Sequence, residues 1–411
     1  MRPPSRHLPP ITPHMADRNF IRPVDLSPAA SGTLDLIRSL AALAVMLGHA
    51  RGLFFVDYGH IAPALTTIPV KLLYFLTGFG HQSVMVFFVL SGLLISSSIF
   101  RNFNRQTWSW RNYAVDRCVR LYLVLLPGLL LGAFWDHLGI RFFNANGLYS
   151  APLVPFGDGI PDRQLAASIF LGNLAFLQTR FTPILGSNGP LWSLFNEFWY
   201  YALFPLLLCA VLSARRRSAK FMAYAAMAAF VAWILNEALS GFLIWVAGAC
   251  VGLTARQYPF PETRKLRARI YAACTLALTV ICLLASRENG GWLGSDLAIG
   301  ISFALLVHRL AQLRGSKLSG STAEFGLRFA RTFASFSYSL YVLHFPLLLL
   351  IRASQLPFAA TRWQPDSTHL LLLCAITGGV TVYAFAVAQV TERRTSDVRA
   401  WVYRQFGSGA R

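Results

Sequence analysis

The sequence predicts an all-α fold, a polytopic integral membrane bundle of about ten transmembrane helices. Three observations predict it. Of the 411 residues, 55% are hydrophobic and only 13% are charged, whereas a soluble globular chain carries roughly a quarter charged residues. The apolar residues gather in runs of about 17 or more, the length that a helix needs to cross hydrocarbon. Lys and Arg concentrate in alternate connecting segments, as the positive-inside rule requires.

Ten apolar runs are expected to cross the membrane. The segments assigned to the cytoplasm, counted with the charges at span edges, hold 27 Lys and Arg residues, and the outer loops hold about seven. This asymmetry places both termini in the cytoplasm and accounts for the net charge of +20, so no nucleic-acid partner is expected. The ten runs cover residues 34–53, 82–100, 118–135, 191–212, 219–235, 238–254, 269–285, 295–312, 334–351 and 368–390.

The remaining sequence divides the chain into three parts. Residues 1–33 are polar, rich in Pro and Arg, and lack an apolar h-region, so we expect a disordered cytoplasmic tail rather than a secretory signal. A transmembrane domain covers residues 34–392, and a cytoplasmic C-terminal tail covers residues 393–411. The apolar run at 165–177 is too short to span comfortably, and we expect a re-entrant or interfacial helix there.

The first predicted helix carries two polar groups, Arg38 and His49, eleven residues apart. Eleven residues make about three helical turns, so both side chains leave one face, roughly 16 Å apart along the axis. Ionisable residues inside a span usually face a bundle interior or a wet cavity. The alternatives are that Arg38 reaches the membrane surface beside Asp35 and that His49 is a structural histidine. Because Arg38 and His49 share one face, we favour a functional role for both, in which they form a polar stripe along the helix.

Arg117 and Arg120 lie three residues apart at the cytoplasmic end of the third predicted helix. Two guanidinium groups on one helix face suit a phosphate clamp, because each binds through two N–H groups and stays charged. Ordinary positive-inside charge is the alternative, since other arginines precede this pair.

The sequence GPLWSLFNEFWYYALFP enters the fourth predicted helix from outside. Ser193 and Glu197 are four residues apart and share a face. A carboxylate at this place suits orienting a histidine or binding sugar hydroxyls, and aromatic side chains suit stacking on a sugar ring. An interfacial aromatic belt is the alternative for the aromatic residues, but it does not explain Glu197. The aromatic candidates are Trp192, Trp199 and Tyr200.

Two further stretches place small or polar residues within spans. In FFVLSGLLIS, Ser91 and Gly92 are interpreted as a site of close helix packing. In FSYSLYVLHFP, His344 lies near the middle of the ninth predicted span, with Tyr338 on a nearby turn. His344 is either a core histidine or part of a cavity wall.

Taken together, these stretches resemble the acyltransferase-3 family of integral membrane acyltransferases. That family includes bacterial O-antigen and exopolysaccharide acetylases and succinylases of periplasmic glucans. The resemblance covers nearly the whole membrane region, with the motifs in the family's order. They are an Arg and a His separated by ten residues, FFVLSG, Arg-x-x-Arg, LWSL..E..YY and YSLY.LH.

The resemblance implies roles for individual residues. In the family, the Arg and His of the first helix and the Arg-x-x-Arg pair are required for activity. Glu197 matches the family's fourth-helix glutamate and is assigned a catalytic role, although Phe198 stands where many members have a second acid. The implied catalytic residue of the first helix is His49, and the implied donor-binding residues are Arg38, Arg117 and Arg120. Candidates for the acceptor site are Ser193, Trp192, Trp199, Tyr200, His344 and Tyr338.

The function implied by this resemblance is transfer of an acetyl group from cytoplasmic acyl-coenzyme A to a hydroxyl of a cell-surface or periplasmic glycan, with succinyl as the other donor group. A polar stripe through the bundle would let the thioester reach across the membrane. His49 would be the general base, because imidazole titrates close to neutral pH. An acyl-histidine intermediate is the alternative to direct transfer.

The expected partners follow from the same resemblance. Acyl-CoA, with acetyl-CoA as the default, is a co-substrate, and neither a permanently bound cofactor nor a metal is expected. The chain is expected in the bacterial inner membrane, in contact with the lipid bilayer, a glycan acceptor and glycan-assembly machinery. Some family members end in a periplasmic SGNH hydrolase domain, which we do not expect here.

Two other classes of function are consistent with parts of the sequence. A transporter of an acyl donor, anion or glycan would also carry intramembrane His and Arg, but the sequence has no inverted repeat. A structural protein of a glycan-assembly machine would not need His49.

The predicted topology is testable by cysteine labelling from the periplasm. Single cysteines placed at Ile160 and Gly290 should react with a membrane-impermeant reagent, and cysteines at Arg216 and Gly320 should react only after the membrane is opened. Reaction of the Arg216 position in intact cells would contradict the topology.

Overall fold

The computed structural model describes residues 23–144, 147–149, 162–258, 265–288, 293–313, 321–355 and 361–405. These residues fold into helices joined by short connections, and apart from isolated bridges no β-strand occurs among them. The predicted all-α class is therefore confirmed.

Ten long helices coincide with the ten predicted runs. In chain order they are α1 (Pro28–Phe54), α3 (Gly80–Asn104), α4 (Trp110–Phe143), α6 (Trp192–Arg215), α7 (Lys220–Leu235), α8 (Leu239–Gln257), α9 (Lys265–Glu288), α10 (Leu293–Leu310), α12 (Ser337–Gln355) and α13 (Ser367–Val390). Shorter helices connect or flank them: α2 (Ile68–Leu76), α5 (Ala167–Leu174), α11 (Ser321–Ala334) and α14 (Thr395–Gln405).

The helices include 8 stretches that are long and apolar enough to cross a membrane. This confirms a polytopic helical membrane protein. One stretch, Lys220–Gln257, contains both α7 and α8, which a short turn at Asn236–Ala238 joins. Among the described residues, α10 does not belong to the eight stretches. The predicted run at 295–312 is thus a helix, but its length and composition alone do not make it a span.

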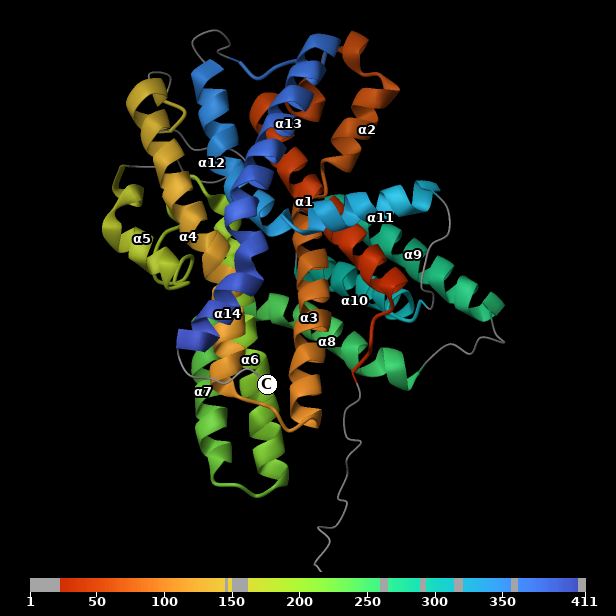
Figure 1. Cartoon of the computed structure of the whole chain (residues 1–411). Helices are drawn as coiled ribbons and strands as arrows, with labels where there is room; N and C mark the ends of the chain where they lie inside the picture. Colours follow the sequence, from red (N-terminus) through yellow and green to blue (C-terminus); the bar gives the residue numbers. More distant parts are fainter. Residues whose placement is uncertain are drawn as a thin grey trace, which may run out of the picture.

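The predicted short element after α4 is also a helix. Within residues 165–177 the structure places α5, which has 8 residues. Such a helix is about 12 Å long, which is too short to cross hydrocarbon. It lies beside α4 (Figure 1), in agreement with a re-entrant or interfacial element.

The N-terminal end of the chain differs from the predicted disordered tail. Helix α1 begins at Pro28, where the missing N–H of proline costs nothing, and the Ser27 hydroxyl accepts a backbone hydrogen bond at 3.1 Å as the cap. Asp25 pairs with Arg256 at 3.0 Å. Residues 23–33 are therefore ordered, contrary to the prediction, while residues 1–22 lie outside the described residues. Helix α14 occupies most of the predicted C-terminal tail.

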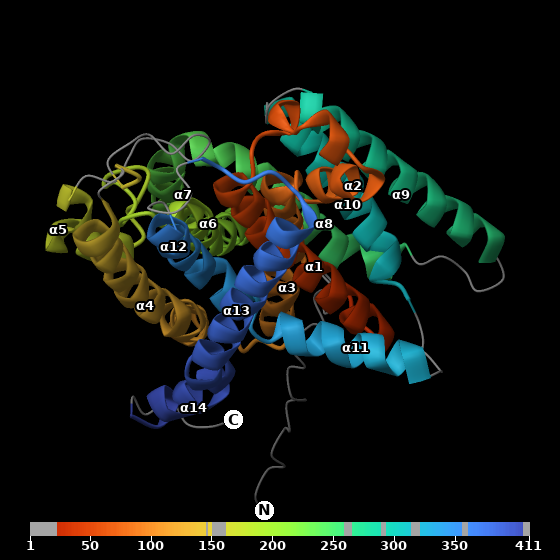
Figure 2. The same ribbon diagram turned by 90° about the horizontal axis from the view of Figure 1, so that it is seen from above.

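Helices α1 and α3 lie in the middle of the bundle. Figures 1 and 2 show α4, α6, α7 and α12 on one side of them and α8, α9 and α10 on the other. The connections α3–α4 and α6–α7 carry the basic residues of 101–117 and 213–218. We call this the basic end of the bundle, which the predicted topology makes cytoplasmic, and we call the opposite end the far end.

Helices α3 and α8 meet at two glycines. A Cβ atom on Gly92 would lie 1.9 Å from the carbonyl oxygen of Trp245, and one on Gly248 would lie 2.0 Å from the carbonyl oxygen of Val89. Neither position has room for a side chain, so the two backbones touch. The predicted close packing at Gly92 is confirmed.

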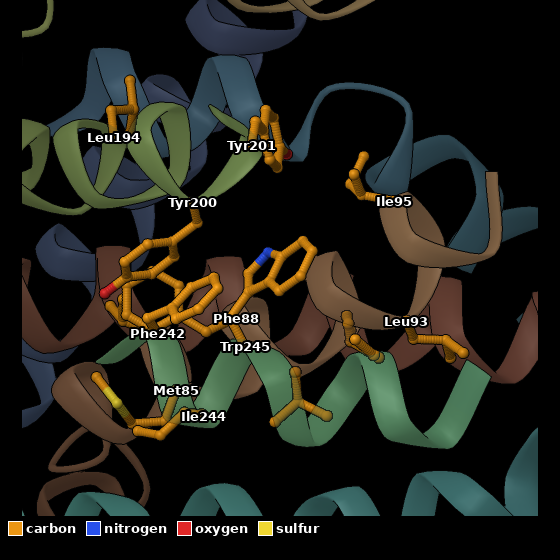
Figure 3. Close-up of a cluster of buried hydrophobic side chains, with 14 of the residues drawn as sticks. Met85, Phe88, Leu93, Ile95, Leu194, Tyr200, Tyr201, Phe242, Ile244 and Trp245 are labelled. Atoms are coloured by element: carbon orange, nitrogen blue, oxygen red, sulfur yellow. The ribbon is translucent and has the colours of Figure 1, made fainter. Parts of the chain in front are cut away.

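Large side chains fill the space around this contact. Figure 3 shows the cluster that α3, α6 and α8 form there. The ring of Phe88 stands edge-on to Tyr200, with centroids 5.4 Å apart, and Trp245 stacks on Phe242 at 5.9 Å. This cluster fixes how α3 and α6 are rotated, and their rotation decides which side chains face the cavities described below.

The glycine contact is testable by a single methyl group. Gly92→Ala should lower the stability of the purified protein by about 1–3 kcal/mol or more, because the new methyl group forces two backbones apart. The thermal midpoint measured in detergent should fall clearly. Gly378→Ala in α13 is the matched control, because nothing lies within 4 Å of its Cβ position, and alanine there should be neutral or stabilising. Equal midpoints for both variants would contradict the close contact.

Candidate functional site

A cavity of about 110 Å³ lies inside the bundle, and we call it the central cavity. Helices α1, α3, α4, α6 and α12 all contribute to its wall. Its polar lining residues are Arg38, Ser91, Arg120, Ser193, Glu197, Tyr201, Ser337, Tyr338, Tyr341 and Glu392. Four of the lining side chains are ionisable as Arg or Glu, which is costly in a membrane protein and marks a functional site by default.

Two arginines supply the positive charge of the cavity. Arg38 donates to the carbonyl oxygen of Ala334 at 3.0 Å and pairs with Asp35 at 3.2 Å. Arg120 is exposed to the cavity and makes no hydrogen bond or ion pair with the residues that the structure describes. Arg38 and Arg120 are near enough to repel each other. A guanidinium pair held this way is suited to binding an anion that enters the cavity.

Arg117 takes a different place from Arg120. Its guanidinium carbon lies 5.7 Å from the centroid of the Tyr113 ring, as in a cation–π contact, and it does not line the central cavity. The structure therefore brings Arg38, rather than Arg117, beside Arg120. Spacing of three residues put both arginines of the motif on one face of α4, but only the deeper one reaches the cavity.

Glu197 is fixed by hydrogen bonds from neighbouring helices. Its Oε1 accepts from the hydroxyl groups of Tyr201 and, at 3.1 Å, Ser91. Ser91 in turn accepts from the indole nitrogen of Trp245 at 3.2 Å. The sequence predicts a packing role for Ser91 beside Gly92. The structure shows that Ser91 also hydrogen-bonds to Glu197 and Trp245.

The position after the glutamate faces away from the central cavity. The ring of Phe198 stacks on Phe176, with centroids 4.2 Å apart and planes within 4°. A phenylalanine instead of a second acid therefore leaves no gap in the cavity wall. The second carboxylate of the cavity comes from Glu392, just after α13.

Glu392 was not singled out in the sequence. Its carboxylate accepts from the backbone N–H and the hydroxyl of Ser339, both at 2.9 Å, and so holds the start of α12. Tyr338 lies next to this bond and lines the cavity. The Tyr338 hydroxyl is buried without a hydrogen-bond partner among the described residues. Because buried polar atoms are rarely left unpaired, this hydroxyl points to a ligand or water in the cavity.

His49 and His344 form a hydrogen-bonded pair. The Nδ1 atom of His49 lies 2.8 Å from Nε2 of His344, and Nδ1 of His344 lies 2.9 Å from the carbonyl oxygen of Leu340. His344 is fully buried and His49 is partly exposed. The pair joins α1 to α12, and sequence reasoning had kept the two histidines apart.

The two hydrogen bonds determine the tautomers of a neutral pair. A carbonyl oxygen only accepts, so Nδ1 of His344 carries the hydrogen and its Nε2 is an acceptor. Nδ1 of His49 must then donate to His344. The lone pair of the His49 ring is therefore on Nε2. This arrangement is the one that a general base with an orienting partner requires.

Tyr341 connects the histidine pair to the cavity. It lines the central cavity, and its ring centroid lies 6.2 Å from that of His344. Its hydroxyl is 2.7 Å from the Ser193 hydroxyl, and both donate towards the carbonyl oxygen of Pro190 at 3.2 Å. The start of α6 is thereby fixed against α12, and the predicted Ser193 and Tyr338 lie in the same cavity as Arg38, Arg120 and Glu197.

A second, larger cavity of about 470 Å³ opens at the far end. Of the predicted aromatic candidates, Trp192 lines it. Trp199 and Tyr200 line neither cavity, and their polar atoms donate to the carbonyl oxygens of Phe176 at 2.9 Å and Ala238 at 2.5 Å. Those two aromatic residues pack the helices.

Comparisons with known proteins place the chain in a family. The model of the acyltransferase domain matches residues 32–388, which is most of the chain. Over 175 residues the chain is 33% identical to the acyltransferase MdmB of Streptomyces mycarofaciens, and the match covers 41% of this chain and 37% of that protein. No solved structure matches the chain. The chain belongs to the acyltransferase-3 family.

Proposed function

We propose that the protein transfers an acetyl group, with succinyl as the other donor group, from cytoplasmic acyl-coenzyme A to a hydroxyl of a cell-surface or periplasmic glycan. The observation that carries this proposal is the His49–His344 hydrogen bond, which puts the lone pair of His49 on Nε2 inside the bundle. Membership of the family supports acyl transfer as the reaction. The His49–His344 pair supports a hydroxyl acceptor, because it provides a base that can take the hydroxyl proton.

The central cavity suits the donor. Its volume of about 110 Å³ is far smaller than the ~300–1,000 Å³ of sites that enclose a whole small molecule, so only the narrow arm of coenzyme A would enter. The phosphates would stay near Arg38 and Arg120, and the thioester would reach towards Tyr341. Along α3 the lining runs from Val84 to Ile95, roughly 16 Å of helix.

The transfer itself needs a base and then an acid. Nε2 of His49 takes the proton of the acceptor hydroxyl while the oxygen attacks the thioester carbonyl carbon. The C–O bond forms, the C–S bond breaks, and the sulfur leaves with the proton that His49 had taken, as a free thiol. His344 accepts from Nδ1 of His49 throughout and stabilises the imidazolium that forms. His344 thus has the orienting role that the sequence had offered to Glu197.

The base is testable by removing it. His49→Ala should slow acyl transfer by about 10²- to 10⁴-fold, the usual contribution of a positioned general base. Donor affinity should stay nearly unchanged, and the wild-type rate should fall at acid pH because a protonated imidazole accepts no proton. Release of free coenzyme A thiol and mass spectrometry of the glycan measure the rate. A folded His49→Ala protein with near wild-type transfer would show that another group is the base.

The orienting role of His344 provides the control for the base. His344→Phe should slow transfer about tenfold, equivalent to about 1.4 kcal/mol, by removing one hydrogen bond to the base. His344→Gln keeps an acceptor and should recover part of that rate. If His344 were purely structural, both variants should have a lower thermal midpoint, and Gln should not recover the rate.

The donor site is testable by comparing the two arginines of α4. Arg120→Ala should weaken acetyl-CoA binding by roughly 10- to 100-fold, since a charged hydrogen bond is lost, and Lys should replace it poorly. The loss should shrink for acetyl-pantetheine, which has no phosphate. Arg117→Ala, three residues away, should leave affinity nearly unchanged. Equal losses in Arg117→Ala and Arg120→Ala would instead favour the paired clamp inferred from the sequence.

A further inference from the structure

The cavity at the far end has the size and the lining of a small-molecule site, and we call it the far cavity. Its volume of about 470 Å³ falls within the ~300–1,000 Å³ of ligand pockets. The ends of α3, α6, α8 and α10 form its walls, and Thr179 and Arg180, which follow α5, close one side. The predicted topology places it on the face of the membrane opposite to the basic end.

The amide of Asn196 is the most informative group in the far cavity. Its residue is only 6% exposed. Its side chain makes no hydrogen bond with any residue in the described part of the chain, yet it lines the cavity. The polar atoms of this amide are open to the cavity, so they are placed to bind a molecule that enters it. An amide both donates and accepts, so its natural partner in the cavity is a hydroxyl group.

Carboxylate groups outnumber guanidinium groups around the far cavity. His81 of α3 bonds to Asp296 of α10 at 3.0 Å, and Arg180 lies 5.5 Å from the centroid of the Trp233 ring at the rim. Glu237 adds a second carboxylate from the turn between α7 and α8. Two acidic side chains therefore face one guanidinium and one imidazole. The cavity has no excess of positive charge with which to attract an anion.

An aromatic surface lies beside these polar groups. Trp192 lines the far cavity, and His81 lies nearly parallel to it, with ring planes within 19° and centroids 6.2 Å apart. A pyranose ring is apolar on its C–H faces and polar at its edge. An indole next to an amide, carboxylates and hydroxyls fits both parts.

We infer that the far cavity is the acceptor site and that it binds a neutral sugar residue, with Asn196 hydrogen-bonded to its hydroxyls. The acceptor role of the far cavity rests on the proposed function, whereas the binding of a neutral sugar there does not. Phe88 lines both cavities, and Trp192 and Ser193 are consecutive residues of α6 that line the far and the central cavity respectively. A sugar in the far cavity would therefore lie next to the wall behind which the donor arm ends.

The test measures sugar binding directly. Full-length protein in lipid nanodiscs, rather than in alkyl-glycoside detergents that would compete for a sugar site, is titrated with neutral methyl hexosides and with the corresponding methyl uronosides. Saturation-transfer NMR reports binding. Wild type should bind hexosides more tightly than uronosides, and Asn196→Ala should weaken hexoside binding about tenfold, as expected for a lost hydrogen bond. Asn112→Ala, on an exposed asparagine at the other end of the bundle, is the matched control.

The outcomes separate the site from the reaction. Unchanged hexoside affinity in Asn196→Ala, equal affinity for uronosides, or no hexoside binding to wild type would overturn the acceptor site, even if His49-dependent consumption of acetyl-CoA persists. Hexoside binding through Asn196 in a protein that consumes no acetyl-CoA would leave the site standing and overturn the proposed reaction. Acetyl-CoA affinity should be the same in wild type, Asn196→Ala and Asn112→Ala.

Discussion

The backbones of α3 and α8 touch at Gly92 and Gly248, and the positions of both cavities depend on this contact. With no side chain between the helices, α3 has one fixed rotation. That rotation turns Ser91 towards Glu197 and Trp245, so the hydroxyl next to the glycine joins three helices. In lipid, helices associate through such packing and through hydrogen bonds, because burial of apolar surface adds little there. The contact between Gly92 and Gly248 therefore determines both how α3 packs on α8 and where the Ser91 hydroxyl lies.

In the proposed reaction, the histidine pair would supply an oriented base without a buried charge beside it. A general base needs a partner that holds its tautomer, and soluble enzymes often use a carboxylate. A carboxylate buried in a bundle is costly to desolvate. A second imidazole, whose own N–H is bound to the Leu340 carbonyl oxygen, orients His49 without adding a charge. The two carboxylates of the site, Glu197 and Glu392, lie instead in the cavity that carries the arginines, where their charges are balanced.

Apolar runs and basic clusters were enough to predict the ten long helices, but not α2, α11 or α14, because hydropathy is a local property and these three helices are short. The close approach at Gly92 was predictable for the same reason. The partners of the site residues were not. His344 lies 295 residues from His49 in the chain, and no local pattern indicates that contact. Arg117 and Arg120 share a face by spacing, yet only Arg120 lines the cavity, because its place depends on how α4 packs against helices that are distant in the chain. Glu392 follows the last apolar run and looked like the start of a tail, although the start of α12 depends on it.

Phe88 has a consequence for the membrane as well as for the reaction. It is 3% exposed, it stands edge-on to both Trp192 and Tyr200, and it lines the central and the far cavity. Under the predicted topology these cavities face opposite compartments. If one substrate enters from each compartment, as proposed, the wall between the two cavities must also limit the leak of protons across the bilayer, and Phe88 forms part of that wall. The aromatic packing between α3 and α6 would then help to preserve the proton gradient as well as to shape the two cavities.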